Sequence, residues 1–231
     1  MGTAYMKMAE DAFKHLALNA GVLAKNFNPA TGQLATADLL GLTSGGVKFA
    51  ANPQYEDFAA DIDQANNNMK EFKRKVSDDP TMSGNFVELT PDLVKLLMAG
   101  DKSAVTQDSN ATGKTPYKIT PRSALTAADF QDLWWIGDYS DENTGQNAGF
   151  LAVHLMNALN TTGFQINAQK NAKAQFAFEW HAHYTNADPD TVPYEIYIKD
   201  GGAKAVSGGG GSSGGGDSSG GGNASGSGTP A

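Results

Sequence analysis

Apolar and polar side chains alternate most regularly near residue 180. Over residues 174–184 the even-numbered positions are apolar or aromatic, whereas most odd-numbered positions are polar. Successive side chains of a β-strand point to opposite faces, so this period of two predicts a strand with one buried face. Residues 194–199 and 164–168 repeat the pattern on a smaller scale, and residues 171–173 are predicted to turn the chain before the long strand.

Apolar runs bounded by turn residues predict further strands earlier in the chain. Two of these runs, residues 150–156 and 133–136, are rich in aliphatic and aromatic side chains and end at Gly, Asp or Asn. Residues 46–51 and 84–89 are two more candidates. Strands therefore dominate the predicted elements.

One segment has helical periodicity instead. Thr90 is a favourable N-cap, Pro91 suits the first helical position, and Asp92 complements the positive end of the helix dipole. The apolar stripe that follows is formed by Leu93, Leu96 and Leu97. Gly100 is expected to end the helix. A short amphipathic helix among many strands packs one face onto a sheet, so the predicted fold is mainly β, a β-sandwich or barrel with one flanking α-helix.

Three segments lack a clear period. Residues 52–69 are acidic and rich in Asn, and residues 102–115 are polar with several turn-forming residues, which predicts an exposed loop. Residues 207–231 are almost entirely Gly and Ser, and such a sequence cannot bury enough apolar surface to fold. The predicted organisation is a β domain over residues 1–206 and a flexible, disordered tail over residues 207–231.

Composition removes several classes of site and partner. The 231-residue chain contains no cysteine, which excludes disulfides, thiolate metal sites and a cysteine nucleophile and is typical of a protein made in a reducing cytoplasm. Its formal net charge of −8 argues against tight binding to nucleic-acid phosphates. The N-terminus lacks the pattern of a signal peptide, and no apolar run approaches the roughly 20 residues that span a membrane, so neither is expected.

The sharpest candidate for chemistry is a polar strand face. Glu179, His181 and His183 are two residues apart and would project from one face, with His154 as a further ligand only if another strand brings it close. A strand separates such positions by roughly 7 Å, which is poor spacing for a single-strand chelate. We therefore favour a solvated strand face, and no metal or other cofactor is expected.

Two adjacent tryptophans are candidates for binding or for an interface. Trp134 and Trp135 could stack on sugars or bases, or one ring could lie in the core and the other near a subunit interface, which is the favoured interpretation. Neither a Gly-x-Ser-x-Gly nucleophile turn nor a phosphate-binding P-loop occurs. Abundant carboxylates leave a glycosidase-like pair open, but no residue is assigned a catalytic role.

Six blocks of sequence are characteristic as a set, although none of them is a chemical motif. The blocks are LNAGVLAKNFNPATG at 18–32, TSGGV at 43–47, the acidic segment 55–63, TMSG at 81–84, LWWIGDYS at 133–140 and DTVPYEIY at 190–197. With these blocks, which cover most of residues 16–199, the chain resembles the major tail proteins, or tail tube proteins, of long non-contractile-tailed bacteriophages.

The resemblance implies assembly and not catalysis. Members of this family have a β-sandwich or barrel with one helix, form rings of six subunits, and stack the rings into a hollow tube through which DNA passes into the host without specific binding. The further partners implied are a tape-measure protein and the terminator and tip proteins of the tail. The implied location is the virion tail, after synthesis in the host bacterial cytoplasm.

The resemblance also implies roles for individual residues. By position, residues 52–69 match a long loop that contacts the next ring and orders on stacking, and its contact candidates are Tyr55, Glu56, Asp57, Asp61 and Asp63. The aromatic candidates for the core or for a subunit interface are Trp134, Trp135 and Tyr139. Two other functions stay open, a metal-dependent β-sandwich enzyme and a carbohydrate- or surface-binding module. A tube of the secretion-system type would share the architecture.

Overall fold

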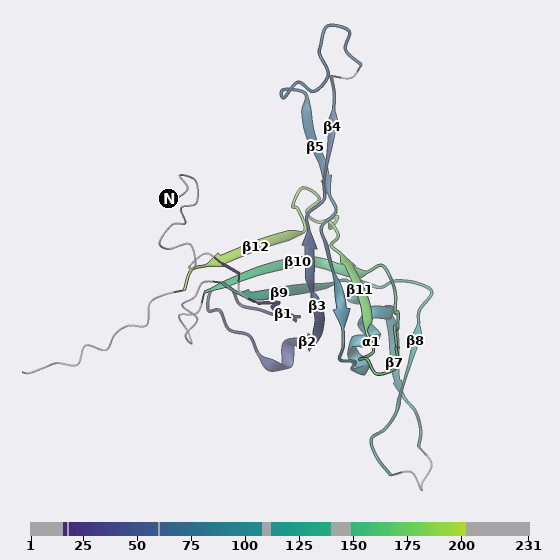
Figure 1. Ribbon diagram of the computed structural model, residues 1–231. Coiled ribbons are helices and arrows are strands. Elements are labelled where there is room, and N and C mark those ends of the chain that lie inside the picture. The colour runs from purple at the N-terminus through teal and green to yellow at the C-terminus, as the bar shows by residue number, and fades with distance from the viewer. Residues whose placement is uncertain (1–15, 18, 60, 108–111, 140–148, 202–231) are drawn as a thin grey trace, which may run out of the picture.

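The computed structural model describes residues 16–17, 19–59, 61–107, 112–139 and 149–201 (Figure 1). Within these residues the protein is mainly β, with one α-helix, α1 (Pro91–Met98). The predicted tail, 207–231, lies outside the described residues. The strands of the body are β1 (Val22–Ala24), β2 (Leu39–Gly41), β3 (Thr43–Ala50), β6 (Thr81–Phe86), β9 (Gln131–Asp138), β10 (Phe150–Asn160), β11 (Phe176–His181) and β12 (Tyr194–Lys199).

These eight strands form one antiparallel sheet that bends at its longest strand, β10. The N-terminal half of β10 lies between β9 and β12, whereas its last two residues pair with β11. From β11 the sheet continues through β6 to β3, and from β9 it continues through β1 to β2. The β9–β10 register shifts between Leu155 and Ala158, where Asn157 has a positive φ of 49°. A bulge of this kind bends the strand, and the two halves of the sheet enclose the core in the manner of a β-sandwich.

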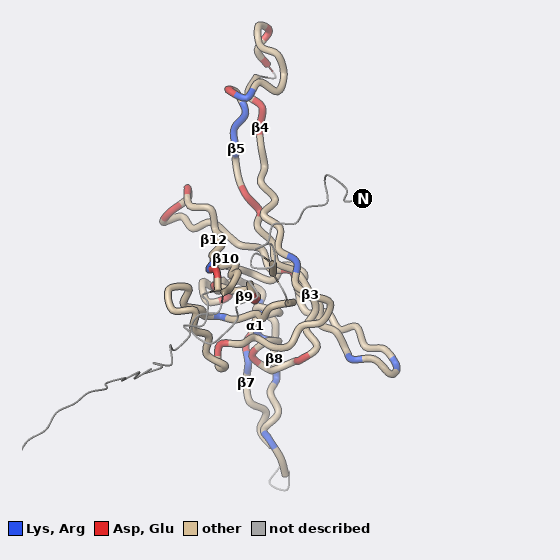
Figure 2. The backbone as a smooth tube through the Cα atoms, turned by 60° about the vertical axis from the view of Figure 1, so that its left-hand side comes forward, with Lys and Arg blue, Asp and Glu red and all other residues tan. Residues whose placement is uncertain are grey.

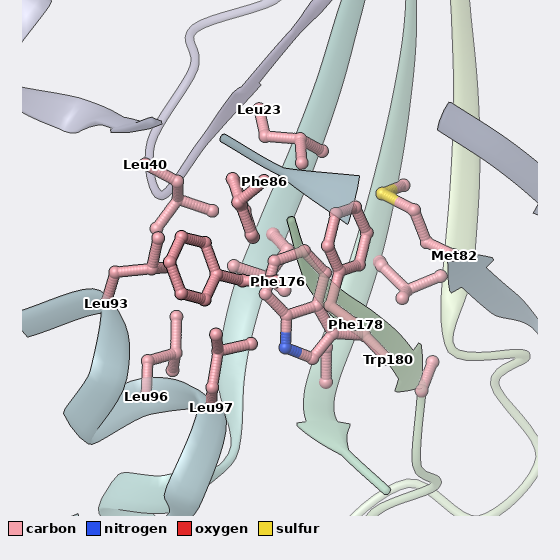
Figure 3. Packing of buried hydrophobic residues seen from close by; sticks show 14 of the residues in the cluster. Leu23, Leu40, Met82, Phe86, Leu93, Leu96, Leu97, Phe176, Phe178 and Trp180 are labelled. Atoms are coloured by element: carbon pink, nitrogen blue, oxygen red, sulfur yellow. The ribbon is translucent and has the colours of Figure 1, made fainter. Parts of the chain in front are cut away.

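The main hydrophobic core lies between the halves of the sheet and beneath α1 (Figure 3). Phe178 and Trp180 of β11 stack with 4.4 Å between ring centroids, and Phe86 of β6 packs edge-on against Trp180 at 5.8 Å. Gly84 leaves room for this stack, because a Cβ at that position would lie 2.8 Å from the Phe178 ring. Each fully buried aliphatic or aromatic side chain stabilises the fold by about 1.5–3 kcal/mol, so this cluster is the main source of stability.

The strand predictions are mostly confirmed, with shifted ends. Residues 194–199 form β12, residues 133–136 lie within β9, and β10 extends beyond the predicted 150–156. Residues 46–51 correspond to β3, and β6 begins before the predicted 84–89. The strand predicted across 174–184 is β11, whose buried face is confirmed at Phe176, Phe178 and Trp180.

One strand prediction is wrong. Residues 164–168 alternate in the sequence, but only Asn167 makes a β-bridge, to Gln175. Ile166 is 59% exposed, so the alternation does not reflect a buried face here. The predicted turn after this segment is confirmed, because Asn171 has a positive φ of 62° within a turn.

The helix is confirmed, and its end is corrected by one residue. The Thr90 side chain accepts a hydrogen bond from the Leu93 backbone N–H, and Pro91 stands at the first helical position. The predicted stripe is buried at Leu93, Leu96 and Leu97. The left-handed residue that ends the helix is Ala99, with φ 47° and ψ 49°, and not Gly100, which begins the next strand.

Two hairpins leave the body in opposite directions (Figures 1 and 2). The β4–β5 arm, residues 52–79, contains β4 (Pro53–Asp57) and β5 (Lys73–Asp78). The β7–β8 arm, residues 100–121, contains β7 (Gly100–Ala104) and β8 (Tyr117–Pro121). The two segments without a clear sequence period, 52–69 and 102–115, therefore lie in these arms, and the second is only partly the loop that was predicted.

Candidate assembly interface

The β4–β5 arm continues the β3–β6 hairpin of the body beyond a kink at Asn52. Asn52 has a positive φ of 45°, which Asn tolerates better than most residues, and its side-chain amide donates to the Asp79 carbonyl at 3.0 Å. The Asp79 carboxylate lies 2.7 Å from Nδ1 of His181 on β11. These contacts tie both strands of the arm to the sheet where the arm begins.

An ion pair supports the same end of the arm. Lys75 Nζ lies 2.5 Å from Oδ2 of Asp78, whose side chain is 1% exposed. The neighbouring Asp78 carboxylate raises the pKa of Lys75. The backbone N–H of Asp78 donates to the Tyr184 hydroxyl at 3.0 Å. A carboxylate removed from water needs a cationic partner, which Lys75 supplies from within β5. The hydrogen bond to Tyr184 is the contact that holds this end of β5 against the body.

Asp57 closes the tip of the arm. Its Oδ1 accepts the backbone N–H of Ala59 at 3.0 Å, and its Oδ2 accepts the backbone N–H of Asn68 at 2.6 Å. These two hydrogen bonds, with Ala59 first, lower the pKa of Asp57. Ala59 is fully buried within the tip. Within the described residues, the two sides of the tip are therefore joined by contacts from the same chain.

The β4–β5 arm exposes several large apolar side chains, although it projects from the body and has no core of its own. Its large apolar side chains that are 36–59% exposed are Tyr55, Phe58, Ile62, Met69 and Val76. Exposed apolar residues are ordinary when they occur singly, but a group of them on a projecting hairpin indicates a surface used for binding.

The structure divides the predicted contact residues of this segment into two kinds. Tyr55 and Glu56 are exposed on β4, and Asp61 and Asp63 are exposed at the tip. These four side chains are open to a partner. Asp57 instead directs both carboxylate oxygens at the arm's own backbone, so its role within the chain is structural.

The β7–β8 arm is anchored by Arg122, which follows β8. The Arg122 guanidinium donates to Asp101 of β7 at 2.5 Å and also to the carboxylate of buried Asp129. These two carboxylates, Asp129 first, raise the pKa of Arg122. Burial alone would raise the pKa of Asp129, but the Thr126 backbone N–H, Arg122 and the Thr126 hydroxyl together lower it.

A second ion pair joins the β7–β8 arm to α1. Lys102 Nζ lies 2.6 Å from the Asp92 carboxylate in the first turn of α1. This hydrogen bond lowers the pKa of Asp92. The Lys102 ammonium also lies 4.9 Å from the centre of the Tyr117 ring on β8. Beyond these contacts the arm extends away from the body, with Val105 42% and Tyr117 49% exposed.

The body itself presents open strand edges. Within the described part of the chain, β2 and β3 stand at the ends of the sheet and β12 pairs only with β10. The alternation in β12 predicts a buried face, but Ile196 is 50% and Ile198 62% exposed. An apolar cleft of about 270 Å³ separates β3 from this region, lined by Val47, Phe49, Trp135, Leu151, Val153 and Ile196. Unpaired edges beside an apolar cleft favour association with another chain.

Trp134 and Trp135, the tryptophans predicted to serve the core or an interface, lie on opposite faces of β9. Trp134 is 7% exposed and stacks on His154, with 4.0 Å between centroids and 5° between the ring planes. Trp135 lines the apolar cleft, and its Nε1–H donates to the Ala20 carbonyl at 2.9 Å. Tyr139 follows β9 and forms an isolated bridge with Ala17. Trp134 is thus a core residue, and Trp135 is the ring that borders open surface.

The three histidines in the described part of the chain are not gathered into one site. His181 contacts Asp79, and its Nε2 lies 3.9 Å from Glu179. His183 instead lies against the Asn157 carbonyl at 3.1 Å. His154 is on β10, with its ring nitrogens each 3.6 Å from one carboxylate, those of Asp132 and Glu195. Among the described residues no group of three or more His, Asp or Glu side chains is arranged to hold a metal ion.

Sequence reasoning missed the residues that hold the arms. Arg122 lies in a segment without periodicity, and its partner Asp101 is 21 residues away in the chain. Asn52 is separated from its partner Asp79 by the whole arm. Asp57 was predicted as a contact residue, but its structural role was missed because its partner Asn68 lies across the tip. One local signal was available, the Thr126-x-x-Asp129 spacing of a capping box, which the structure forms around a 3₁₀ turn at Ala127–Asp129.

Comparison with protein-family models and with curated proteins finds no match to the chain. None of the described helices has the length and apolar character that crossing a membrane requires. The functional argument therefore depends on the arms, the open edges and the sequence blocks.

Proposed function

We propose that this protein is the tail tube subunit of a long non-contractile-tailed bacteriophage. In this proposal six copies form a ring, rings stack head to tail around a tape-measure protein, and terminator and tip proteins close the tube. The tube lies in the virion and conducts DNA into the host, and the chain catalyses no reaction.

The observation that carries the proposal is the β4–β5 arm. It projects from the body and is fixed at its base by the Asn52–Asp79 and Asp78–Tyr184 hydrogen bonds. It is closed at its tip by Asp57 and exposes apolar side chains without a core to cover. An ordered projection of this kind gains apolar burial only by contact with another molecule. The sequence blocks support a second copy of this chain as that molecule.

The open edges of β3 and β12 support lateral association. Backbone groups on an unpaired edge gain hydrogen bonds when a strand of another chain is added, and the apolar cleft beside these edges gains burial at the same time. Identical head-to-tail contacts between copies close into a ring when the rotation between them closes. Lateral contacts and the arm thus supply contacts in two different directions.

The rival functions receive less support from the same residues. A sugar-binding platform needs an open aromatic face, whereas Trp134 is covered by His154. A metal site at Glu179, His181 and His183 needs convergent ligands, whereas His183 is held at Asn157. The metal-dependent enzyme and the carbohydrate-binding module stay predictions that fewer contacts in the structure support.

Shortening the β4–β5 arm tests the proposal. Tyr55 and Lys75 pair directly across the arm, so an Asn-Gly turn can replace residues 56–74 and still keep the Lys75–Asp78 ion pair. We expect wild-type protein to form stacked tubes in negative-stain electron microscopy at high concentration, and the shortened variant to stop at rings or at single subunits. A variant that lacks residues 207–231 is the control and should still form tubes. Tubes of normal length from the shortened variant would contradict the proposed role of the arm.

A further inference from the structure

The two arms carry opposite charge at their far ends. The tip of the β4–β5 arm, residues 58–69, contains Asp61 and Asp63 and no Lys or Arg. The outer part of the β7–β8 arm, residues 104–118, contains Lys114 and Lys118, with Asp108 as its only acid. Asp108 lies outside the described residues. The sequence of this part therefore has a net charge of +1 against −2 on the opposite tip.

These charged side chains have no ionic partner within the described part of the chain. The salt bridges of Lys and Arg there join Lys75 with Asp78, Lys102 with Asp92, and Arg122 with Asp101 and Asp129 near the bases of the arms. One more, between Lys70 and Glu71, lies beside the tip of the β4–β5 arm. Asp61, Asp63, Lys114 and Lys118 are exposed and take part in none of them. The charges of these four side chains are thus not neutralised by an ion pair within the described chain.

The two arms point in opposite directions, so one copy can meet the next copy tip to arm. The β4–β5 arm and the β7–β8 arm project to opposite ends of the molecule in two views that differ by 60° about the vertical axis (Figures 1 and 2). In Figure 2 the outermost coloured position of the first arm is acidic, with basic and acidic positions mixed below it, and basic positions lie along the outer part of the second arm. A shift of one copy along this shared direction brings its acidic tip toward the basic arm of its neighbour.

We propose that the β7–β8 arm is the receptor for the β4–β5 arm of the next copy along the tube. Asp61 and Asp63 pair with Lys114 and Lys118 of that copy, and exposed Phe58 and Ile62 pack against Val105 and Tyr117. The inference rests on the proposed function and adds to it the partner surface, its residues and the dependence of stacking on charge.

Complementary charge favours a second copy as the occupant. Any other partner of the acidic tip would need its own basic surface, whereas this chain carries one at its opposite end. A single exposed pair contributes little, but the same contact repeated around a ring adds up. Exposed pairs are screened by salt, so stacking should weaken as ionic strength rises. The apolar contacts of the arms would persist at high salt.

A charge-reversal cycle tests the pairing. The first variant is Asp61→Lys with Asp63→Lys, the second is Lys114→Asp with Lys118→Asp, and the third combines all four changes. We expect each of the first two to raise the protein concentration needed for tubes about tenfold, and the third to return it to within about threefold of the wild type. Raising NaCl from about 50 mM to about 500 mM should raise that concentration for wild type and for the combined variant alike.

Controls separate the contact from the fold. Lys170→Asp with Lys173→Asp makes the same change of charge as the second variant, in an exposed part of the body, and should leave the tube threshold unchanged. The neutral variants Asp61→Asn with Asp63→Asn should give a smaller increase than charge reversal. Thermal unfolding of each variant, measured below the assembly threshold, should match that of wild type, because these side chains have no partner within the described chain.

The outcomes distinguish the two proposals. If wild type forms tubes and the single-arm reversals assemble as it does, or if the combined variant does no better than either of them, the pairing of the arms is wrong and the tube function stands. If wild-type protein forms no rings or tubes at any concentration, with or without the tape-measure and tip proteins, the proposed function fails and the arm pairing with it. If both single-arm reversals weaken assembly and the combined variant recovers it, the result supports the tube function and the pairing of the arms.

Discussion

At the scale of single residues, Asp57 decides the shape of the arm's tip. Because its two oxygens each accept a backbone N–H, its replacement by Ala removes both bonds at once. We expect Asp57→Ala to speed hydrogen exchange at the Ala59 and Asn68 amides about tenfold, while amides in the body keep their protection. Hydrogen exchange resolved to single residues by NMR would measure this effect.

The matched control for this prediction is Asp63→Ala. Asp63 is a carboxylate on the same tip, but it accepts none of the hydrogen bonds described for the chain. Exchange at the Ala59 amide should therefore be unchanged in Asp63→Ala. Equal acceleration in both variants would mean that the tip responds to a loss of charge and not to the loss of the two Asp57 bonds.

At the scale of elements, the backbone at the end of α1 is strained, because a residue other than Gly adopts the left-handed conformation there. Ala99 adopts the left-handed conformation, with φ 47°, which costs a residue with a Cβ about 1 kcal/mol relative to Gly. We expect Ala99→Gly to raise the free energy of unfolding by about 1 kcal/mol and the Tm by about 2–4 °C. Thermal unfolding followed by circular dichroism measures both.

Ala104→Gly provides the comparison for Ala99→Gly. Ala104 is exposed at the end of β7 and has no positive φ, so Gly there only adds freedom to the unfolded chain and should lower the Tm slightly. If Ala99→Gly lowers the Tm as well, the left-handed conformation of Ala99 is not a source of strain.

At the scale of the whole molecule, three carboxylates make the fold sensitive to acid. The pKa values of Asp57, Asp92 and Asp129 are lowered in the folded chain. The folded state therefore binds fewer protons than the unfolded state below about pH 5, and the stability these groups provide is present above their ordinary pKa and lost as the pH falls. We expect the Tm to fall progressively between about pH 5 and about pH 3.

Asp129→Asn isolates the contribution of the Asp129 carboxylate, which contacts Arg122 and Thr126, to this acid sensitivity. Asn cannot ionise, so the variant should be less stable than wild type at neutral pH, and the difference should shrink as the pH falls through the carboxylate range. Thermal unfolding over a pH series measures the difference. A gap between the two proteins that stays constant down to about pH 3 would rule out the Asp129 carboxylate as a source of acid sensitivity.

The sequence by itself determined the elements whose periodicity records burial. Phe176, Phe178 and Trp180 alternate because β11 buries one face, and the leucine stripe of α1 has helical spacing because one side of the helix covers the core. Local chemistry also determined the start of the helix at Thr90. In each case the physical cause acts between residues close in sequence, so the pattern is visible without the fold.

Only the tertiary structure decided what the remaining segments do. The arms are exposed on both faces, so burial leaves no period in their sequence, and their shape depends on contacts such as Arg122–Asp101 and Asn52–Asp79 between distant residues. The same reason explains β12, whose alternation predicts burial although Ile196 and Ile198 remain exposed. A period of two identifies an apolar face, but that face is buried only where another layer of the fold packs over it, and the arrangement of the sheet leaves Ile196 and Ile198 uncovered.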